Sequence, residues 1–180
     1  MLTIVATPGD SNANAYVTEA DAAAFLEERL HTEAWTTWDP TSDEMSLVAR
    51  RRAALVTATR LLDEQVQWHG TPVSATQALA WPQHGQVDAY GRPIASTVVP
   101  VAIQRATAYL ALALLRDTSE DPAQATLGAI KSKRLGDTEI VYRDHVAGDA
   151  PGVRLPAEVR RLVQPYGTVS GGMTVPLVRV

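Results

Sequence analysis

Apolar side chains recur at helical spacing in four stretches of the chain, and this pattern predicts a mainly α-helical protein. Thr18 is a capping residue for the first helix, and a longer second helix is expected from residue 42 or 43 to Trp68. A third helix is expected over 100–116 and a short final helix over 156–163. The resulting fold class is a three-to-four-helix bundle.

The third helix is apolar on nearly all sides, which is unusual for a helix of a small bundle. One face carries Ile103 and Leu110, whereas Tyr109, Leu112 and Leu115 stand on the other side. The helix must therefore be covered from several directions. We expect the cover to come from neighbouring subunits or from the linker that precedes the helix.

That linker spans 71–99 and contains an apolar insert where a polar loop would be usual. Ser74 and Gln77 form a capping-box pair, which predicts a single helical turn that ends at Pro82. Leu79 and Trp81 are expected to be buried, each contributing roughly 2 kcal/mol. Trp81 either anchors the linker to its own helices or contacts another subunit.

A strand pattern appears late in the chain. The segments 130–135 and 138–143 flank Gly136-Asp137, which predicts a β-hairpin. After residue 167 the chain is β-prone and apolar, so the end is either disordered or a strand that joins another chain. The predicted organisation is an extended lead over 1–17, a helical connector domain over 18–167 and an extended C-terminal tail over 168–180. The tail residues expected to dock are Val175, Leu177, Val178 and Val180.

Composition fits one soluble domain of ordinary size, with 180 residues of which 46% are hydrophobic. The absence of cysteine suits a reducing cytoplasm. The longest apolar run, 106–115, is far shorter than the roughly 20 residues that cross a bilayer. No basic and then apolar leader opens the chain, so neither export nor membrane insertion is expected.

The net charge of −4 is unevenly distributed. Residues 1–49 carry nine acids and one base, whereas residues 150–180 carry four bases and one acid. The acidic front of one copy could meet the basic back of another in head-to-tail packing, which closes into rings. Alternatively, these charges complement helix ends.

No catalytic or metal-binding constellation is found. The four histidines (His31, His69, His84 and His145) are scattered, and no Gly-rich loop precedes a Lys-Ser or Lys-Thr pair. Asp63 and Glu64 are helix neighbours and are interpreted as part of a solvated face. The chain is therefore expected not to be an enzyme and to need no cofactor or metal.

Four cations on and beside the predicted hairpin are candidates for DNA contact. They stand with Asp137 and Glu139, so the local excess is only two charges and a monomer would bind weakly. Repeated around a ring, the same hairpin could line a channel. The alternative is a solubilising hairpin edge. The candidates are Lys131, Lys133, Arg134 and Arg143.

The order of motifs resembles the head-tail connector or adaptor proteins of tailed bacteriophages, a group that includes DnaT-like single-stranded-DNA-binding proteins. The motifs are Asn14-Ala15-Tyr16-Val17-Thr18, Ala58-Thr59-Arg60-Leu61-Leu62-Asp63, the insert from Ser74 to Pro82, Val99-Pro100, and Gly136-Asp137. They cover roughly residues 14–143, and Ala78-Leu79-Ala80-Trp81-Pro82 is the most specific part.

The resemblance implies a structural adaptor of the virion neck, assembled in the host cytoplasm. Such a protein forms a homo-oligomeric ring of about twelve copies below the portal protein, and the ring docks the tail or a second neck protein. Double-stranded DNA passes through its lumen without sequence specificity. The residues expected to shape the subunit or its interfaces are Leu79, Trp81, Pro82, Tyr109, Leu112 and Leu115.

The alternative function is a single-stranded-DNA-binding accessory protein of replication. Such proteins combine a basic groove with interleaved aromatic residues on which bases stack. No groove of that composition is visible in the sequence, because most aromatic residues fall in apolar patterns. The adaptor is therefore the expected function.

Overall fold

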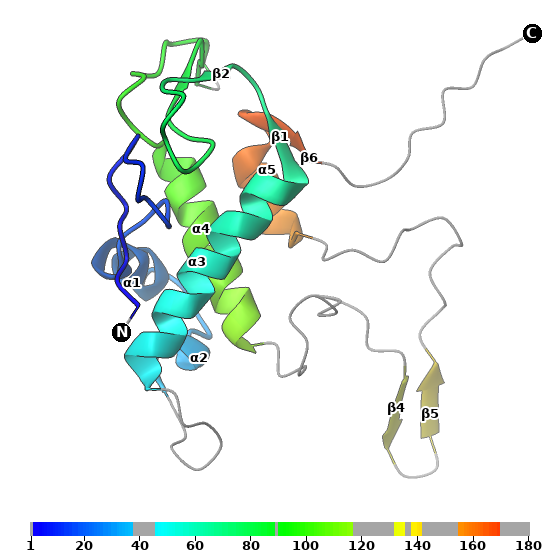
Figure 1. Cartoon of the computed structure of the whole chain (residues 1–180). Coiled ribbons are helices and arrows are strands. Elements are labelled where there is room, and N and C mark those ends of the chain that lie inside the picture. Colours follow the sequence, from blue (N-terminus) through cyan, green and yellow to red (C-terminus); the bar gives the residue numbers. More distant parts are fainter. Residues whose placement is uncertain are drawn as a thin grey trace, which may run out of the picture.

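The computed structural model describes residues 2–37, 46–88, 90–116 and 155–169, together with the backbone of a hairpin at 132–135 and 138–141. Helices form the body of this part of the chain, and its strands form two-stranded antiparallel sheets (Figure 1). The elements are α1 Glu19–Glu27, α2 Glu33–Thr36, α3 Leu47–Gln65, β1 Val66–Trp68, β2 Thr71–Pro72, β3 Gln83–His84, α4 Val101–Arg116, β4 Ser132–Leu135, β5 Thr138–Val141, α5 Ala157–Val163 and β6 Gly167–Val169.

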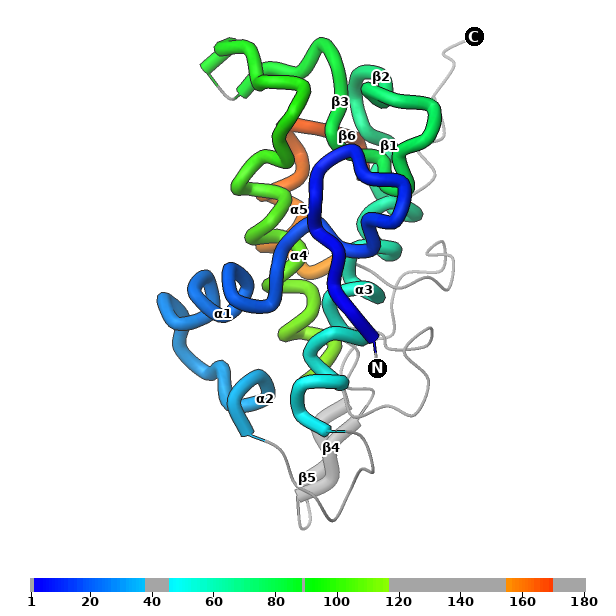
Figure 2. The backbone as a smooth tube through the Cα atoms, turned by 60° about the vertical axis from the view of Figure 1, so that its left-hand side comes forward, coloured from blue at the N-terminus to red at the C-terminus, as the bar shows by residue number. Residues whose placement is uncertain are grey.

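The N-terminus of α1 is where the sequence predicts it. The Thr18 hydroxyl oxygen accepts a hydrogen bond from the Asp21 amide at 3.1 Å and caps the helix. The lead before it is extended and packs on α3, where the Tyr16 amide donates to the Thr59 hydroxyl at 3.4 Å. Figure 2 shows this lead lying in front of α3 and α4. The lead is thus part of the packed body.

The second predicted helix is shorter than its apolar pattern suggested. α3 begins at Leu47, because Ser46 is extended and its hydroxyl caps the Ala49 amide at 3.3 Å. It ends at Gln65, and the next three residues form β1 instead of a last helical turn. β-branched Val66 and aromatic Trp68 suit a strand, and a partner strand from the far end of the chain pairs with them.

Between the first two predicted helices, where the sequence predicts none, lies a short helix, α2. Its Trp35 is buried, with 3% of the residue exposed. The Arg51 guanidinium lies 5.3 Å from the centre of that ring, and Arg51 Nε donates to the Trp35 carbonyl oxygen at 2.7 Å. One arginine of α3 therefore fixes this segment against the bundle.

α4 is covered by other helices of its own chain. It contacts α1, α2, α3 and α5, and these contacts bury residues on both of its predicted faces, including Ile103, Leu110 and Leu112. The sequence left two covers open, neighbouring subunits and the linker, and for these residues helices of the same chain supply the cover, so neighbouring subunits are not required. The sequence could not show this, because α1, α2 and α5 are short and far from one another along the chain.

The linker forms a turn at Ser74 where the sequence predicted one turn of helix. The reciprocal bonds of the capping pair are present in part: the Ser74 amide donates to Gln77 Oε1 at 3.0 Å. Gln77 Nε2, however, donates to the carbonyl oxygens of Leu79 and Pro82, at 2.8 and 3.1 Å. The glutamine side chain thus closes a loop around its own carbonyl groups instead of opening a helix.

Trp81 lies at the centre of an aromatic cluster. Its side chain is buried and precedes a cis peptide bond to Pro82. Trp68 and Tyr166 both meet it edge to face, with ring centroids 5.9 and 5.8 Å away. These contacts join the linker to β1 and to the residue before β6.

A carboxylate beside that cluster ties three segments together. Asp63 Oδ1 accepts from the Tyr16 hydroxyl at 2.5 Å and from Trp68 Nε1 at 3.0 Å, and Oδ2 accepts from the Ala80 amide at 3.2 Å. The Tyr16 hydroxyl oxygen also accepts from the Trp81 amide at 3.3 Å. The interpretation of Asp63 as a solvated residue is therefore wrong.

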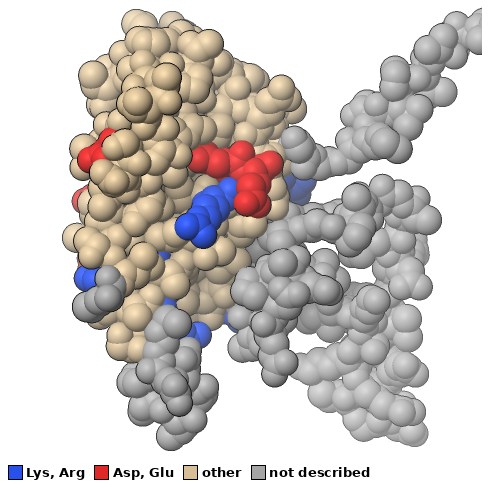
Figure 3. All heavy atoms as spheres, viewed as in Figure 1, with Lys and Arg blue, Asp and Glu red and all other residues tan. Residues whose placement is uncertain are grey.

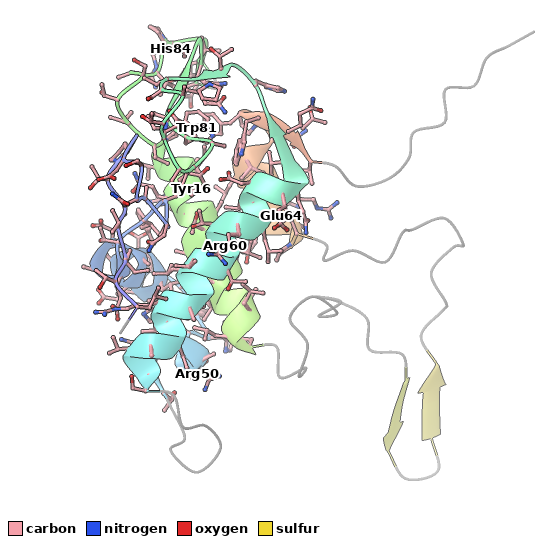
Figure 4. All side chains as sticks on the ribbon, in the orientation of Figure 1. Tyr16, Arg50, Arg60, Glu64, Trp81 and His84 are labelled. Atoms are coloured by element: carbon pink, nitrogen blue, oxygen red, sulfur yellow. The ribbon has the colours of Figure 1, made fainter. Side chains whose placement is uncertain are left out.

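Its neighbour Glu64 is exposed on the outer face of α3, where Figure 4 labels it with Arg60. Two successive helix residues lie about 100° apart, so one can face the lead and linker while the next faces solvent. Burial raises the pKa of Asp63, although the hydrogen bonds from Tyr16, Ala80 and Trp68 oppose that shift.

Two boundaries near the C-terminus follow from the strands. The hairpin is confirmed, with Lys133 opposite Ile140 and Arg134 opposite Glu139 in the register of β4 and β5. β6 pairs with β1, so the folded body continues to Val169 and not to residue 167.

No helix within the described ranges is long and apolar enough to cross a membrane.

Replacing Asp63 by alanine is expected to destabilise the fold strongly. The change leaves three partly buried donors without an acceptor, at a cost of roughly 1 kcal/mol or more each. Urea unfolding of Asp63→Ala should therefore show a loss of about 3 kcal/mol. The matched control is Glu64→Ala, which removes the same charge from the exposed side and should change stability by less than about 0.5 kcal/mol. Equal losses in the two variants would contradict the role given to Asp63.

The pH dependence of stability gives a second prediction. Because the pKa of Asp63 is raised in the folded protein, the folded state keeps a proton that the unfolded chain releases above about pH 4. The free energy of unfolding of the parent protein, relative to that of Asp63→Asn, should therefore fall as the pH rises above about 4. Unfolding of both proteins between pH 4 and pH 8 measures the difference, and a difference independent of pH would refute the prediction.

Candidate nucleic-acid interface

The residues predicted to shape the subunit lie in or against the core. Trp81, Pro82 and Leu112 are buried, and Leu79, Tyr109 and Leu115 are half-buried. They make packing contacts within one chain and leave little surface for another. The other two predicted groups fall outside the described side chains: Lys131, Lys133, Arg134 and Arg143 at the hairpin, and Val175, Leu177, Val178 and Val180 in the tail.

Charge is balanced over the part of the chain that the structure describes with side chains, which carries ten arginines and ten acidic residues. Figure 3 shows that the face seen in Figure 1 has few charged side chains, with basic and acidic groups side by side near its middle. The described body therefore has no broad basic face in this view. A DNA site on it must depend on a small number of arginines that lack acidic partners.

Most of the arginines are paired. Arg29 binds Glu158, Arg52 binds Glu19, Arg92 binds Asp88, and Arg105 lies 3.6 Å from Glu28. Arg160 and Arg161 are exposed, and neither forms a salt bridge with a described side chain. These two neighbouring residues of α5 are the strongest candidates for contact with an anion.

The sequence of α5 explains where these side chains lie. Val159 and Val163 stand four residues apart and are fully buried against the bundle. Arg160, Arg161 and Gln164 consequently share the opposite side of the helix, because residues three and four apart are neighbours on a helix surface. The two arginines are therefore held beside each other by the packing of α5.

A cleft of about 660 Å³ lies along this side of α5. Its walls are the polar face of the helix and the strand that follows it. Guanidinium groups offer paired donors that match phosphate oxygens, and the amide and hydroxyl of Gln164 and Thr168 can add hydrogen bonds. The cleft can therefore hold a phosphate group or a short run of sugar-phosphate backbone. The lining residues are Ala157, Arg160, Arg161, Gln164, Gly167, Thr168 and Val169.

The second wall depends on a glycine at the start of β6. A Cβ at Gly167 would lie 2.6 Å from Val66 Cγ1 and 2.8 Å from the Gln67 carbonyl oxygen, so only glycine allows this approach to β1. The His69 amide extends the contact by donating to the Tyr166 carbonyl oxygen at 2.9 Å. Thr168 is exposed, and its hydroxyl lies 3.4 Å from His69 Nε2.

The acid on α5 is neutralised on the other side of the helix. Arg29 makes two hydrogen bonds to Glu158, at 2.8 and 3.0 Å, and its guanidinium lies 4.0 Å from the centre of the Tyr109 ring. The bond to Glu158 raises the pKa of Arg29. Because Glu158 is occupied by Arg29, it does not compete for Arg160 and Arg161.

Sequence reasoning missed this site, although one signal was present. Arg160, Arg161 and Gln164 lie at helical spacing and form a polar face, but from the sequence alone this segment predicts only a short helix over 156–163. The other wall had no signal, since three residues of β6 pair with a strand about 100 residues earlier. Within the described residues there is also no group of three or more potential metal ligands.

Comparison with known proteins gives a family and no individual relative. The model of the family described as "Putative DnaT-like ssDNA binding protein" matches residues 1–180, which is the whole chain. No curated protein and no solved structure matches the chain.

Proposed function

Because the chain belongs to the family of DnaT-like ssDNA-binding proteins, we propose that it binds single-stranded DNA as an accessory protein of replication. The α5–β6 cleft is the proposed site, and the phosphate backbone is the part of the strand that it holds. The observation that carries this proposal is that Arg160 and Arg161 line that cleft and form no salt bridge with any side chain that the structure describes.

The composition of the cleft favours binding without sequence preference. Arginine pairs bind phosphate oxygens, which every nucleotide carries, whereas base identity is recognised through groups aimed at base edges. The aromatic residues next to β6 are occupied elsewhere: Tyr166 is buried, and Trp68 packs on Trp81 and donates to Asp63. The cleft therefore supplies charge and hydrogen bonds and does not supply a stacking platform.

The number of cations sets the strength of this interaction. Two arginines neutralise about two phosphates, and the rest of the described body, with eight arginines and ten acidic residues, has a net charge of −2 that adds no long-range attraction for DNA. Binding by one subunit should accordingly be weak and easily weakened by salt. For single strands, the logarithm of the binding constant falls with the logarithm of salt concentration with a slope of roughly −0.7 per phosphate contact.

Replacing both cleft arginines is expected to change that slope. The variant Arg160→Gln/Arg161→Gln should bind a thymidine oligonucleotide more weakly, and its salt slope should be shallower by about 1.4, since two phosphate contacts are lost. Fluorescence anisotropy with the full chain at several salt concentrations measures both quantities. The control Arg60→Gln/Arg116→Gln removes the same charge from exposed arginines of α3 and α4 that do not line the cleft.

Two results would overturn the proposed function. If the parent protein binds no single-stranded oligonucleotide at low salt, the chain does not have this activity. If the two double variants bind with the same affinity and the same salt slope, any binding lies outside the α5–β6 cleft. The same experiment with a duplex of equal length tests the preference for single strands.

A second candidate is the ring-forming adaptor of the phage neck, which the resemblance in the sequence implies. One feature of the described body favours it: large apolar side chains are exposed next to its helices. Leu30 is 83% exposed at the end of α1, and Val98 and Val101 are 43% and 55% exposed at the start of α4. Such residues suit contacts between subunits.

Sizing with light scattering separates the two candidates. An adaptor should form an assembly of many copies, either alone or when mixed with a portal protein. A protein that remains monomeric in both settings would count against the adaptor, while leaving single-stranded-DNA binding intact. The substitution Val101→Asp places a charge on this exposed apolar surface. It should lower the mass of any assembly without affecting the α5–β6 cleft.

A further inference from the structure

One aromatic side chain of the described body is almost fully exposed to solvent. Tyr90 is 84% exposed, whereas Trp35, Trp81, Tyr16 and Tyr166 are buried. Burial of a large apolar side chain stabilises a fold by roughly 2 kcal/mol, and Tyr90 gives up this stabilisation. It lies between Val87 and Pro93, which pair across the base of a short loop.

This loop is held in one shape by Asp88. The carboxylate oxygen Oδ1 accepts from the amides of Tyr90 and Arg92, at 2.8 and 2.9 Å, and Oδ2 accepts from Arg92 Nε at 2.6 Å. The backbone closes the same turn, because the Gly91 amide donates to the Asp88 carbonyl oxygen at 2.9 Å. Gly91 has a φ of 77°, a conformation that favours glycine. These bonds hold the Tyr90 and Arg92 amides against Asp88.

The ring of Tyr90 is supported on one face and open on the other. The Arg92 guanidinium lies 5.2 Å from the ring centroid, which is within the range of a cation–π contact. With 84% of the residue exposed, the ring retains a large free surface. A flat, supported and solvent-facing ring is the arrangement on which an unpaired base stacks.

The loop contributes little charge of its own, because Arg92 is paired with Asp88. The same hydrogen bonds lower the pKa of Asp88, so its carboxylate stays ionised at neutral pH. Attraction for phosphate is therefore not the property that this loop adds. Its contribution to binding would come from the π-face of Tyr90 and should depend little on salt.

Contacts through the linker place the loop at the same end of the molecule as the cleft. The turn at Gly70 packs so closely on this linker that a Cβ there would lie 2.5 Å from the His84 carbonyl oxygen and 2.6 Å from Gln86 Nε2. Gln86 accepts from the Ile94 amide at 2.9 Å at the base of the loop, and His69, beside Gly70, bonds to the residue before β6. Figure 1 shows the linker above β1 and β6.

We infer that Tyr90 stacks on an unpaired base of a single strand whose phosphates lie in the α5–β6 cleft. This inference rests on the proposed function and adds a second contact of different chemistry: the cleft binds backbone charge, and the loop binds a base. It also supplies the aromatic component that the cleft itself lacks.

The test compares Tyr90→Ala and Tyr90→Leu in the full chain, with a thymidine oligonucleotide and an abasic strand of equal length as probes. Tyr90→Ala should bind the thymidine strand about 5- to 150-fold more weakly, the equivalent of one lost stack, with an unchanged salt slope. Binding of the abasic strand should not change. Tyr90→Leu should behave like the alanine variant, because it keeps apolar area but has no π-face. The control Leu30→Ala removes an equally exposed apolar side chain from the segment after α1 and should have no effect.

The outcomes separate this inference from the proposed function. Tyr90 is not a stacking residue if the parent protein and Tyr90→Ala bind the thymidine strand equally. If the cleft variant Arg160→Gln/Arg161→Gln still has a shallower salt slope in that case, the proposed function stands. Full binding by Tyr90→Leu would also overturn stacking. Absence of any binding by the parent protein overturns both.

Discussion

The structure depends on one carboxylate that satisfies donors from three separate segments. Asp63 projects from α3 and accepts from Tyr16 in the lead, Trp68 in β1 and the Ala80 amide in the linker. A partly buried carboxylate is costly unless hydrogen bonds compensate for lost hydration, and three donors provide that compensation here. These bonds add to the contact between the Tyr16 amide and the Thr59 hydroxyl that holds the lead on α3, and they bind the linker residue before Trp81 to the same helix.

The geometry of the candidate interface depends on these hydrogen bonds of Asp63. Trp68 donates to Asp63 and meets Trp81 edge to face, and Trp81 in turn meets Tyr166 immediately before β6. β1 and β6 are thereby fixed where Gly167 allows them to touch, and β6 forms one wall of the cleft beside α5. The linker that Asp63 holds also carries the Tyr90 loop. The proposed phosphate contact and the proposed base contact thus lie at the same end of the described body.

The helices other than α2 could be predicted from the sequence, because apolar residues repeat at helical spacing in each of them and Thr18 caps the first. The hairpin could be predicted as well, from the turn at Gly136-Asp137. The role of Asp63 could not, since a carboxylate beside Glu64 has the same local pattern whether it faces solvent or a tyrosine. The cleft could not be predicted either, because its two walls meet only where β1 and β6 pair over three residues. These strands lie about 100 residues apart in the chain. Such contacts depend on tertiary packing and leave no periodic signal.

Hydrogen exchange of the full chain, with and without a thymidine oligonucleotide at low salt, tests the central claim most directly. The account predicts that the oligonucleotide slows exchange at the amides of α5, β6 and the Tyr90 loop, and leaves α2, which lies at the other end of the bundle in Figure 1, unchanged. Slowed exchange confined to the hairpin at 132–141, or no change anywhere on the chain, would contradict it.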